Sequence, residues 1–106
     1  MAEFENPFEE TEEVARAKLV AETAKIEWQA LQRFFAAGKA IAVASDHDLV
    51  DVAYAVSCDD SGALKSWVEG GAVSPVSDEQ ARDWFESEAS VWAVVVRPWV
   101  FVQAID

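Results

Sequence analysis

The sequence VWAVVVRPWVFVQ, residues 91–103, has the strongest strand signal in the chain. β-Branched and aromatic residues fill both of its halves, and these residue types are enriched in strands. The dipeptide Arg97-Pro98 separates the halves, and a proline between two β-rich runs favours a turn. The stretch therefore predicts a C-terminal β-hairpin. The alternative is one long strand that is broken by a bulge at Pro98.

The second run of this stretch is apolar on both of its faces. Trp99 and Phe101 share one face, and Val100 and Val102 share the other. A strand of this kind is covered on both sides. Two arrangements satisfy the pattern: a central strand buried wholly within the chain, or a strand whose Trp99 face contacts a second protein. Tryptophan is enriched at interface hot spots, so Trp99 and Phe101 are candidate partner-surface residues.

The segments before the hairpin alternate between helical and extended patterns. Apolar residues recur at three- and four-residue steps from Glu9 to Ala37, which predicts one long helix that Gly38 ends. Apolar residues off this stripe predict that the helix buries more than one face or bends near Ile26. The remaining patterns predict a buried strand at 40–44, helices at 48–57 and 61–69, an extended piece at 72–76 and a helix at 78–87.

Capping residues mark the starts of three of these helices. Asn6-Pro7 or Thr11 suits the start of the first helix. Ser45 or Asp46 suits the helix at 48–57. Ser77, followed three residues later by glutamine, forms a capping-box pattern before the last helix.

This order of elements predicts an α+β fold. We expect a single small domain over residues 9–106, with about four helices packed on a short, largely antiparallel sheet that ends in the hairpin. We expect residues 1–8 to form a disordered acidic N-terminus. Of the 106 residues, 52% are hydrophobic, which suffices for a core without disulfides or metal.

The net charge of −12 argues against direct nucleic-acid binding, since phosphate contact needs clustered Lys and Arg. Six of the 20 acidic residues lie in the first thirteen positions, as in a solvated tail. An acidic surface that mimics nucleic acid is the alternative explanation. One cysteine, no N-terminal signal pattern and no apolar run of about 20 residues predict a cytoplasmic protein without a membrane helix.

Several short motifs in these segments are distinctive. They are Glu22–Ile26 with Trp28, Leu31–Ala36 with Gly38, Ile41–Ala44 with Asp48–Val50, Val76–Ala81 with Trp84, and Trp92–Val96 with Pro98–Val100. Over roughly residues 15 to 103 the chain resembles a bacterial family catalogued as domain of unknown function 2288. Because this family has no assigned function, the resemblance indicates no particular activity and names no catalytic residues.

One cluster is the strongest candidate for a metal or catalytic site: Asp46, His47, Asp48 and Asp51. His47 is the only histidine in the sequence, and histidine with carboxylates can bind a metal. A standard zinc site needs more nitrogen or sulfur ligands than this cluster offers. Carboxylates here also suit a helix N-terminus, so we favour a capping role over a metal or catalytic one.

Two further features invite a functional interpretation. Cys58 is a candidate nucleophile, but a buried or helix-end thiol is the simpler interpretation. The segment 49–73 is similar in outline to a helix-turn-helix. Its second helix offers only Lys65 as a base, against Glu69, so DNA binding is disfavoured.

From these observations we expect a non-enzymatic, cytoplasmic protein-binding or regulatory module, with a homodimer among its expected forms. No cofactor is predicted. The first alternative is a small metal-dependent or ligand-binding enzyme that uses Asp46, His47, Asp48 and Asp51. The second alternative is an acidic nucleic-acid mimic.

Overall fold

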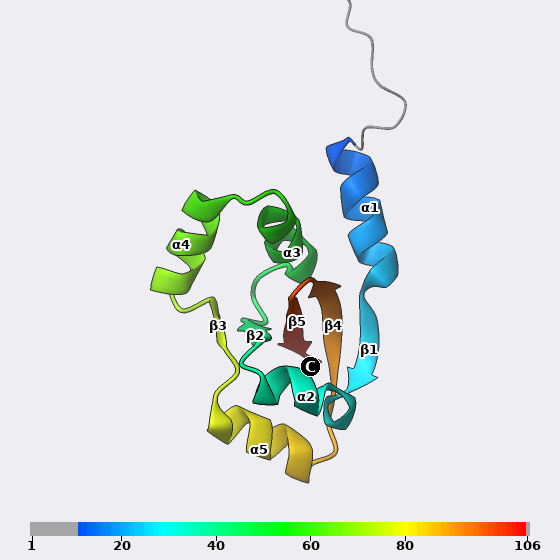
Figure 1. Ribbon diagram of the computed structural model, residues 1–106, viewed down its shortest axis with the longest axis vertical. Helices are drawn as coiled ribbons and strands as arrows, with labels where there is room; N and C mark the ends of the chain where they lie inside the picture. The colour runs from blue at the N-terminus through cyan, green and yellow to red at the C-terminus, as the bar shows by residue number, and fades with distance from the viewer. Residues whose placement is uncertain (1–10, 106) are drawn as a thin grey trace, which may run out of the picture.

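The computed structural model describes residues 11–105, which fold around one five-stranded sheet (Figure 1). The strand order is β1-β4-β5-β2-β3. Only β2 and β5 pair in parallel, and the other neighbours pair antiparallel. The predicted α+β fold with a largely antiparallel sheet is therefore confirmed. The strands are β1 Ala24–Glu27, β2 Ala40–Val43, β3 Val73–Pro75, β4 Ser90–Val96 and β5 Trp99–Ala104.

The C-terminal stretch forms the predicted hairpin. β4 and β5 pair antiparallel, with Val96 opposite Trp99 and Val94 opposite Phe101, so the single bulged strand is excluded. β5 lies between β4 and β2 in the middle of the sheet. This position leaves Val100 and Val102 with no exposed surface. The double-sided apolar pattern of β5 follows from its central place in the sheet.

The predicted long helix over residues 9–37 is wrong. α1 Glu12–Glu22 ends at Thr23, whose hydroxyl and N–H donate to the Leu19 carbonyl at 2.6 and 2.9 Å. The chain then continues as β1, which obtains backbone partners from β4. Pairing with a distant strand overrides the local helical periodicity. A 3₁₀ helix, η1 Trp28–Leu31, and a short helix, α2 Gln32–Ala36, complete the segment.

The division of this segment also changes which side chains are buried. Leu19 is buried against α3 and the sheet, while Val14, earlier in the same helix, is 46% exposed. The remaining helices are α3 Leu49–Ser57, α4 Ser61–Glu69 and α5 Asp78–Glu86. The described residues thus form five α-helices, not about four.

Side-chain caps begin three of the helices near the predicted positions. Thr11 accepts from the Val14 N–H at 3.2 Å, and Ser77 accepts from the Gln80 N–H at 3.1 Å. Asp48 caps α3, not Ser45 or Asp46 as predicted, because α3 begins only at Leu49. The predicted cap at Asn6-Pro7 and the predicted disordered segment 1–8 lie outside the described residues.

Helices cover both faces of the sheet. Trp28 of η1 is fully buried on one face, beneath α2 and α5, and meets Phe35 and Trp84 edge-on with ring centroids 5.8 and 5.1 Å away. We call this the α2/α5 face. Residues of α1 and α3 cover the other face, around Val94 and Phe101, and we call it the α1/α3 face. Between Thr11 and Ile105, no helix is long and apolar enough to cross a membrane.

Candidate functional site

An apolar groove lies between α4 and the sheet on the α1/α3 face. Its volume is about 300 Å³. Ser74 is its only polar lining residue, and no charged side chain lines it. The apolar lining residues come from α3, α4 and strands β2, β3 and β5: Ile41, Val56, Leu64, Val68, Val73, Pro75, Trp99 and Phe101.

The placement of α4 creates this groove. α4 contains no buried residue, because two of its sides face open hollows. Leu64 and Val68 line the groove, and Trp67 lines a second cavity that residues of α1 and α3 also line. At its C-terminal end the chain turns through Gly71, at φ +83°, and Ala72 N–H donates to the Trp67 carbonyl at 2.9 Å. This tight turn keeps the end of α4 beside β3.

The two partner-surface candidates take different roles at the groove. Phe101 is only 3% exposed, so it packs within the chain and forms part of the groove floor. Trp99 lies at the start of β5 and is 37% exposed. Val68 on α4 is 55% exposed. The surface available to a partner therefore comes mainly from Trp99 and Val68.

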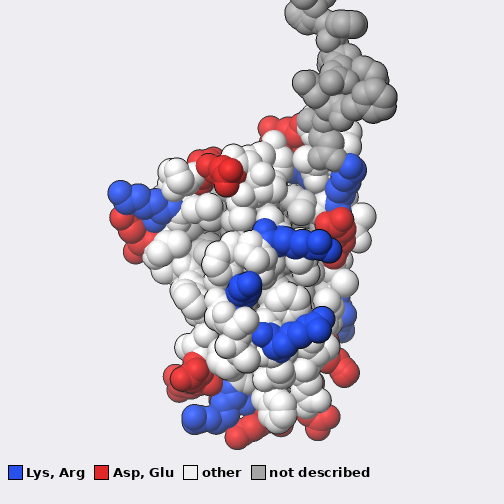
Figure 2. Space-filling model, viewed as in Figure 1, with Lys and Arg blue, Asp and Glu red and all other residues white. Residues whose placement is uncertain are grey.

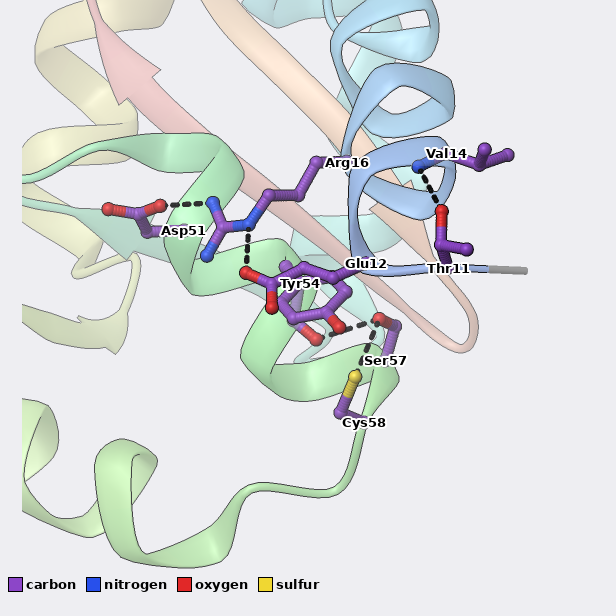
Figure 3. Close-up of polar contacts among 8 residues, drawn as sticks. All are labelled: Thr11, Glu12, Val14, Arg16, Asp51, Tyr54, Ser57 and Cys58. Atoms are coloured by element: carbon purple, nitrogen blue, oxygen red, sulfur yellow. Dashed lines mark hydrogen bonds and ion pairs between the residues drawn. The ribbon is translucent and has the colours of Figure 1, made fainter. Parts of the chain in front are cut away.

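A polar cluster joins α1 to α3 (Figure 3). Arg16 donates to Glu12, 3.0 Å away, and to Asp51 of α3. Its guanidinium also lies 4.7 Å from the centre of the Tyr54 ring, a cation–π contact. The hydrogen bond with Asp51, followed by that with Glu12, raises the pKa of Arg16. This cluster fixes α1 against α3.

The end of α3 continues the polar cluster. The hydrogen bond with Cys58, followed by burial, raises the pKa of the Tyr54 hydroxyl. Ser57 donates to the Tyr54 carbonyl at 2.7 Å (Figure 3). Cys58 is an exposed free thiol at the C-cap of α3. Among the predicted alternatives, the structure thus places Cys58 at a helix end and not in the core.

Arg16 and Tyr54 were not among the site residues predicted from sequence. The four-residue spacing of Glu12 and Arg16 was visible, since such pairs are neighbours on a helix. The contact with Asp51 spans 35 residues, and no local pattern predicts it.

The four candidate metal ligands do not share one partner: Asp46 and His47 contact each other, and Asp48 and Asp51 each contact another residue. His47 Nδ1 lies 3.1 Å from Asp46 Oδ1, and this hydrogen bond lowers the pKa of Asp46. Asp48 accepts from the Val50 N–H at 2.8 Å, and Asp51 pairs with Arg16. Within residues 11–105, no group of three or more His, Cys, Asp or Glu side chains is placed to hold a metal ion.

The charge of the described residues is unevenly distributed. Residues 11–105 contain all eight basic residues and fifteen of the twenty acidic ones. On the face in Figure 2, most acidic side chains lie toward the rim, and the charged side chains near the middle are mostly Lys and Arg. This face therefore lacks the continuous acidic stripe expected of a nucleic-acid mimic.

Comparisons with known proteins give one family and one solved structure. No curated protein matches the chain. The chain is similar to the solution NMR structure of PA1075 from Pseudomonas aeruginosa, with 41% sequence identity and a TM-score of 0.78. The alignment covers 97% of this chain and 94% of that one. The model of the family described as "Protein of unknown function (DUF2288)" matches residues 14–104, and the chain belongs to that family, as its sequence motifs predicted.

Proposed function

We propose that this chain is a non-enzymatic protein-binding module and that the groove between α4 and the sheet is its binding site. One observation carries the proposal. Val68 and Trp99, two large apolar side chains, are 55% and 37% exposed at the same concave, uncharged surface. Burying exposed apolar surface of this kind against a partner lowers the free energy of the complex.

The lining chemistry indicates the occupant, which is a short apolar segment of another protein. A charged group entering the groove would lose its hydration, and the lining offers no opposite charge in return. A volume of about 300 Å³ is at the lower end of ligand pockets, which matches one or two bulky side chains. Trp99 lies at the start of β5, and tryptophan is enriched among the hot-spot residues of protein interfaces.

The metal-enzyme alternative has less support. Asp46, Asp48 and Asp51 each have a different partner, so they do not converge on one point. Calorimetry with Zn²⁺ and Mn²⁺ tests this alternative. Stoichiometric uptake that His47→Ala abolishes would favour it over groove binding.

The acidic-mimic alternative also has less support, because acidic side chains do not dominate the face in Figure 2. We further propose a cytoplasmic location. An exposed, unpaired Cys58 is compatible with a reducing compartment.

Peptide selection tests the groove. Peptides are selected from a phage-displayed random library on the wild-type chain, and their affinities are measured for two variants. Val68→Glu places a carboxylate at the groove, and Val20→Glu places one at an exposed α1 position outside the groove lining. We expect at least about tenfold weaker binding to Val68→Glu, since a desolvated charge costs several times RT, and unchanged binding to Val20→Glu.

Two outcomes would overturn the proposal. One is a library that yields no peptide binder. The other is a set of selected peptides that bind both variants as tightly as they bind the wild-type chain.

A further inference from the structure

Among residues 11–105, no strand pairs with the outer edge of β1. In the antiparallel register, Ala24 faces Ala93 and Ile26 faces Val91, and the Trp28 N–H donates to the Ala89 carbonyl at 2.9 Å. Hydrogen-bonded pairs alternate along an antiparallel ladder. Residues 24, 26 and 28 therefore direct their backbone groups toward β4, and residues 25 and 27 direct theirs away from the sheet.

No described strand lies on that outer side of β1, which is the first strand in the sheet order (Figure 1). The opposite edge of the sheet is protected differently. β3 has only three residues, and its outward-facing Pro75 has no N–H to donate. β1 contains no proline, so Lys25 and Glu27 each offer both an N–H and a C=O to another strand.

The side chains of β1 complement a second β1. When two copies run antiparallel with Ile26 opposite the partner's Ile26, Lys25 lies opposite the partner's Glu27 and Glu27 lies opposite the partner's Lys25. These are the residues whose backbone groups point outward, so the hydrogen bonds and the charges agree in this register. Opposite charges directly across two strands stabilise the pairing, and like charges destabilise it.

Shifting the register by two residues removes this agreement. One shift places Lys25 opposite the partner's Lys25, and the other places Glu27 opposite the partner's Glu27. An edge lysine commonly opposes strand pairing. Here Glu27, two residues later, lies opposite the partner's Lys25 in only one of these registers, so the charges favour that register.

Apolar surface flanks the β1 edge on both faces of the sheet. On the α2/α5 face, Ile26 borders a hollow of about 300 Å³ whose lining includes Val95, which is 43% exposed. On the α1/α3 face, Trp92 lies opposite Lys25 and is 41% exposed. A second sheet continuing from this edge would lie beside both side chains.

From this geometry we infer that a second copy of the chain pairs with β1 edge to edge, antiparallel, and continues the sheet across two subunits. Such a contact is self-complementary, as a two-fold interface requires. It uses no residue of the groove between α4 and the sheet. Groove binding and dimerisation can therefore fail or succeed independently.

Charge reversal tests the register in solution. Sedimentation velocity on the full 106-residue chain over a range of concentrations should give a mass that rises from one chain toward two. Lys25→Glu and Glu27→Lys should each require at least about tenfold higher concentration for dimerisation, because each places like charges in opposition. The double variant Lys25→Glu/Glu27→Lys should restore the wild-type behaviour.

Both positions are exposed, so circular dichroism should show an unchanged fold in all three variants. A wild-type chain that stays monomeric at millimolar concentration would overturn the inference. So would a dimer whose concentration dependence neither single reversal changes.

Cross-linking provides a second test. Opposed residues in a non-hydrogen-bonded antiparallel pair have Cα atoms about 4.5 Å apart, within the range that a disulfide spans. Ile26→Cys in a Cys58→Ser background should therefore form a disulfide-linked dimer under mild oxidation. Val20→Cys in the same background is the control, since Val20 is exposed on α1. Cross-linking at position 26 no faster than at position 20 would contradict the β1 pairing.

Discussion

The side-chain Nε2 of Gln103 lies 2.6 Å from the carbonyl oxygen of His47 and donates a hydrogen bond to it. The same nitrogen donates to the Ala44 carbonyl at 2.8 Å. One amide thus joins β5 to the connection between β2 and α3, which carries Asp46 and His47. The segment that carries Asp46 and His47 is therefore held against β5 by a structural contact.

Replacing Gln103 should destabilise the chain. Gln103→Ala leaves two carbonyl oxygens without this donor, and we expect a loss of about 1–3 kcal/mol in the free energy of unfolding. Urea denaturation measures the loss. Gln32→Ala is the matched control, because Gln32 makes one such bond, to the Trp28 carbonyl at 3.1 Å. An equal or larger loss for Gln32→Ala would contradict the role given to Gln103.

The cap of α3 distinguishes Asp48 from Asp46. Asp48→Ala removes the acceptor for the Val50 N–H and should cost about 1 kcal/mol in the free energy of unfolding. Asp46→Ala should change it by less than about 0.5 kcal/mol, as for a surface substitution. Thermal or urea unfolding of both variants checks this order. The reverse order would support the cap predicted from sequence at Asp46.

The contact between Asp46 and His47 should be visible in a pH titration. The hydrogen bond with His47 lowers the pKa of Asp46, so His47→Ala should raise that pKa toward its ordinary value. A lowered folded-state pKa stabilises the fold above the ordinary pKa of an aspartate, and the contribution is lost as the pH falls through the lowered pKa. NMR titration of the Asp46 carboxyl measures the change. An identical pKa in both proteins would rule out the contact.

The turn after α5 contains a backbone position that glycine would occupy without strain. Glu88 has φ +54°, in the left-handed region, and its N–H donates to the Phe85 carbonyl at 3.2 Å. Glu88→Gly should raise the free energy of unfolding by about 1 kcal/mol, because glycine adopts this conformation without strain. Glu86→Gly, within α5, should lower it by about 1 kcal/mol. Two destabilised variants would refute the assignment.

Local features of the fold were predictable from sequence, and the division of the N-terminal helical stretch was not. The terminal hairpin and the caps at Thr11 and Ser77 depend on residues close together in the chain, so short patterns contain the information. β1 forms because its partner strand is β4, more than sixty residues later. Local periodicity alone favours a continuous helix through this segment, and only the pairing with β4 interrupts it.

The candidate site divides in the same way. Trp99 was identifiable as a candidate from the apolar pattern of its strand. The groove itself was not, because it exists only where α4 stands beside β3 and leaves Val68 uncovered.

The fold class, the hairpin, the family and the two apolar faces of β5 could all be inferred from the sequence, since composition, periodicity and short motifs encode them locally. The central position of β5, the burial of Phe101 and the partial exposure of Trp99 required the folded chain, as did the place of β1 at the edge of the sheet formed by residues 11–105. Backbone pairing and side-chain burial depend on segments far apart in the chain, so no local pattern contains them.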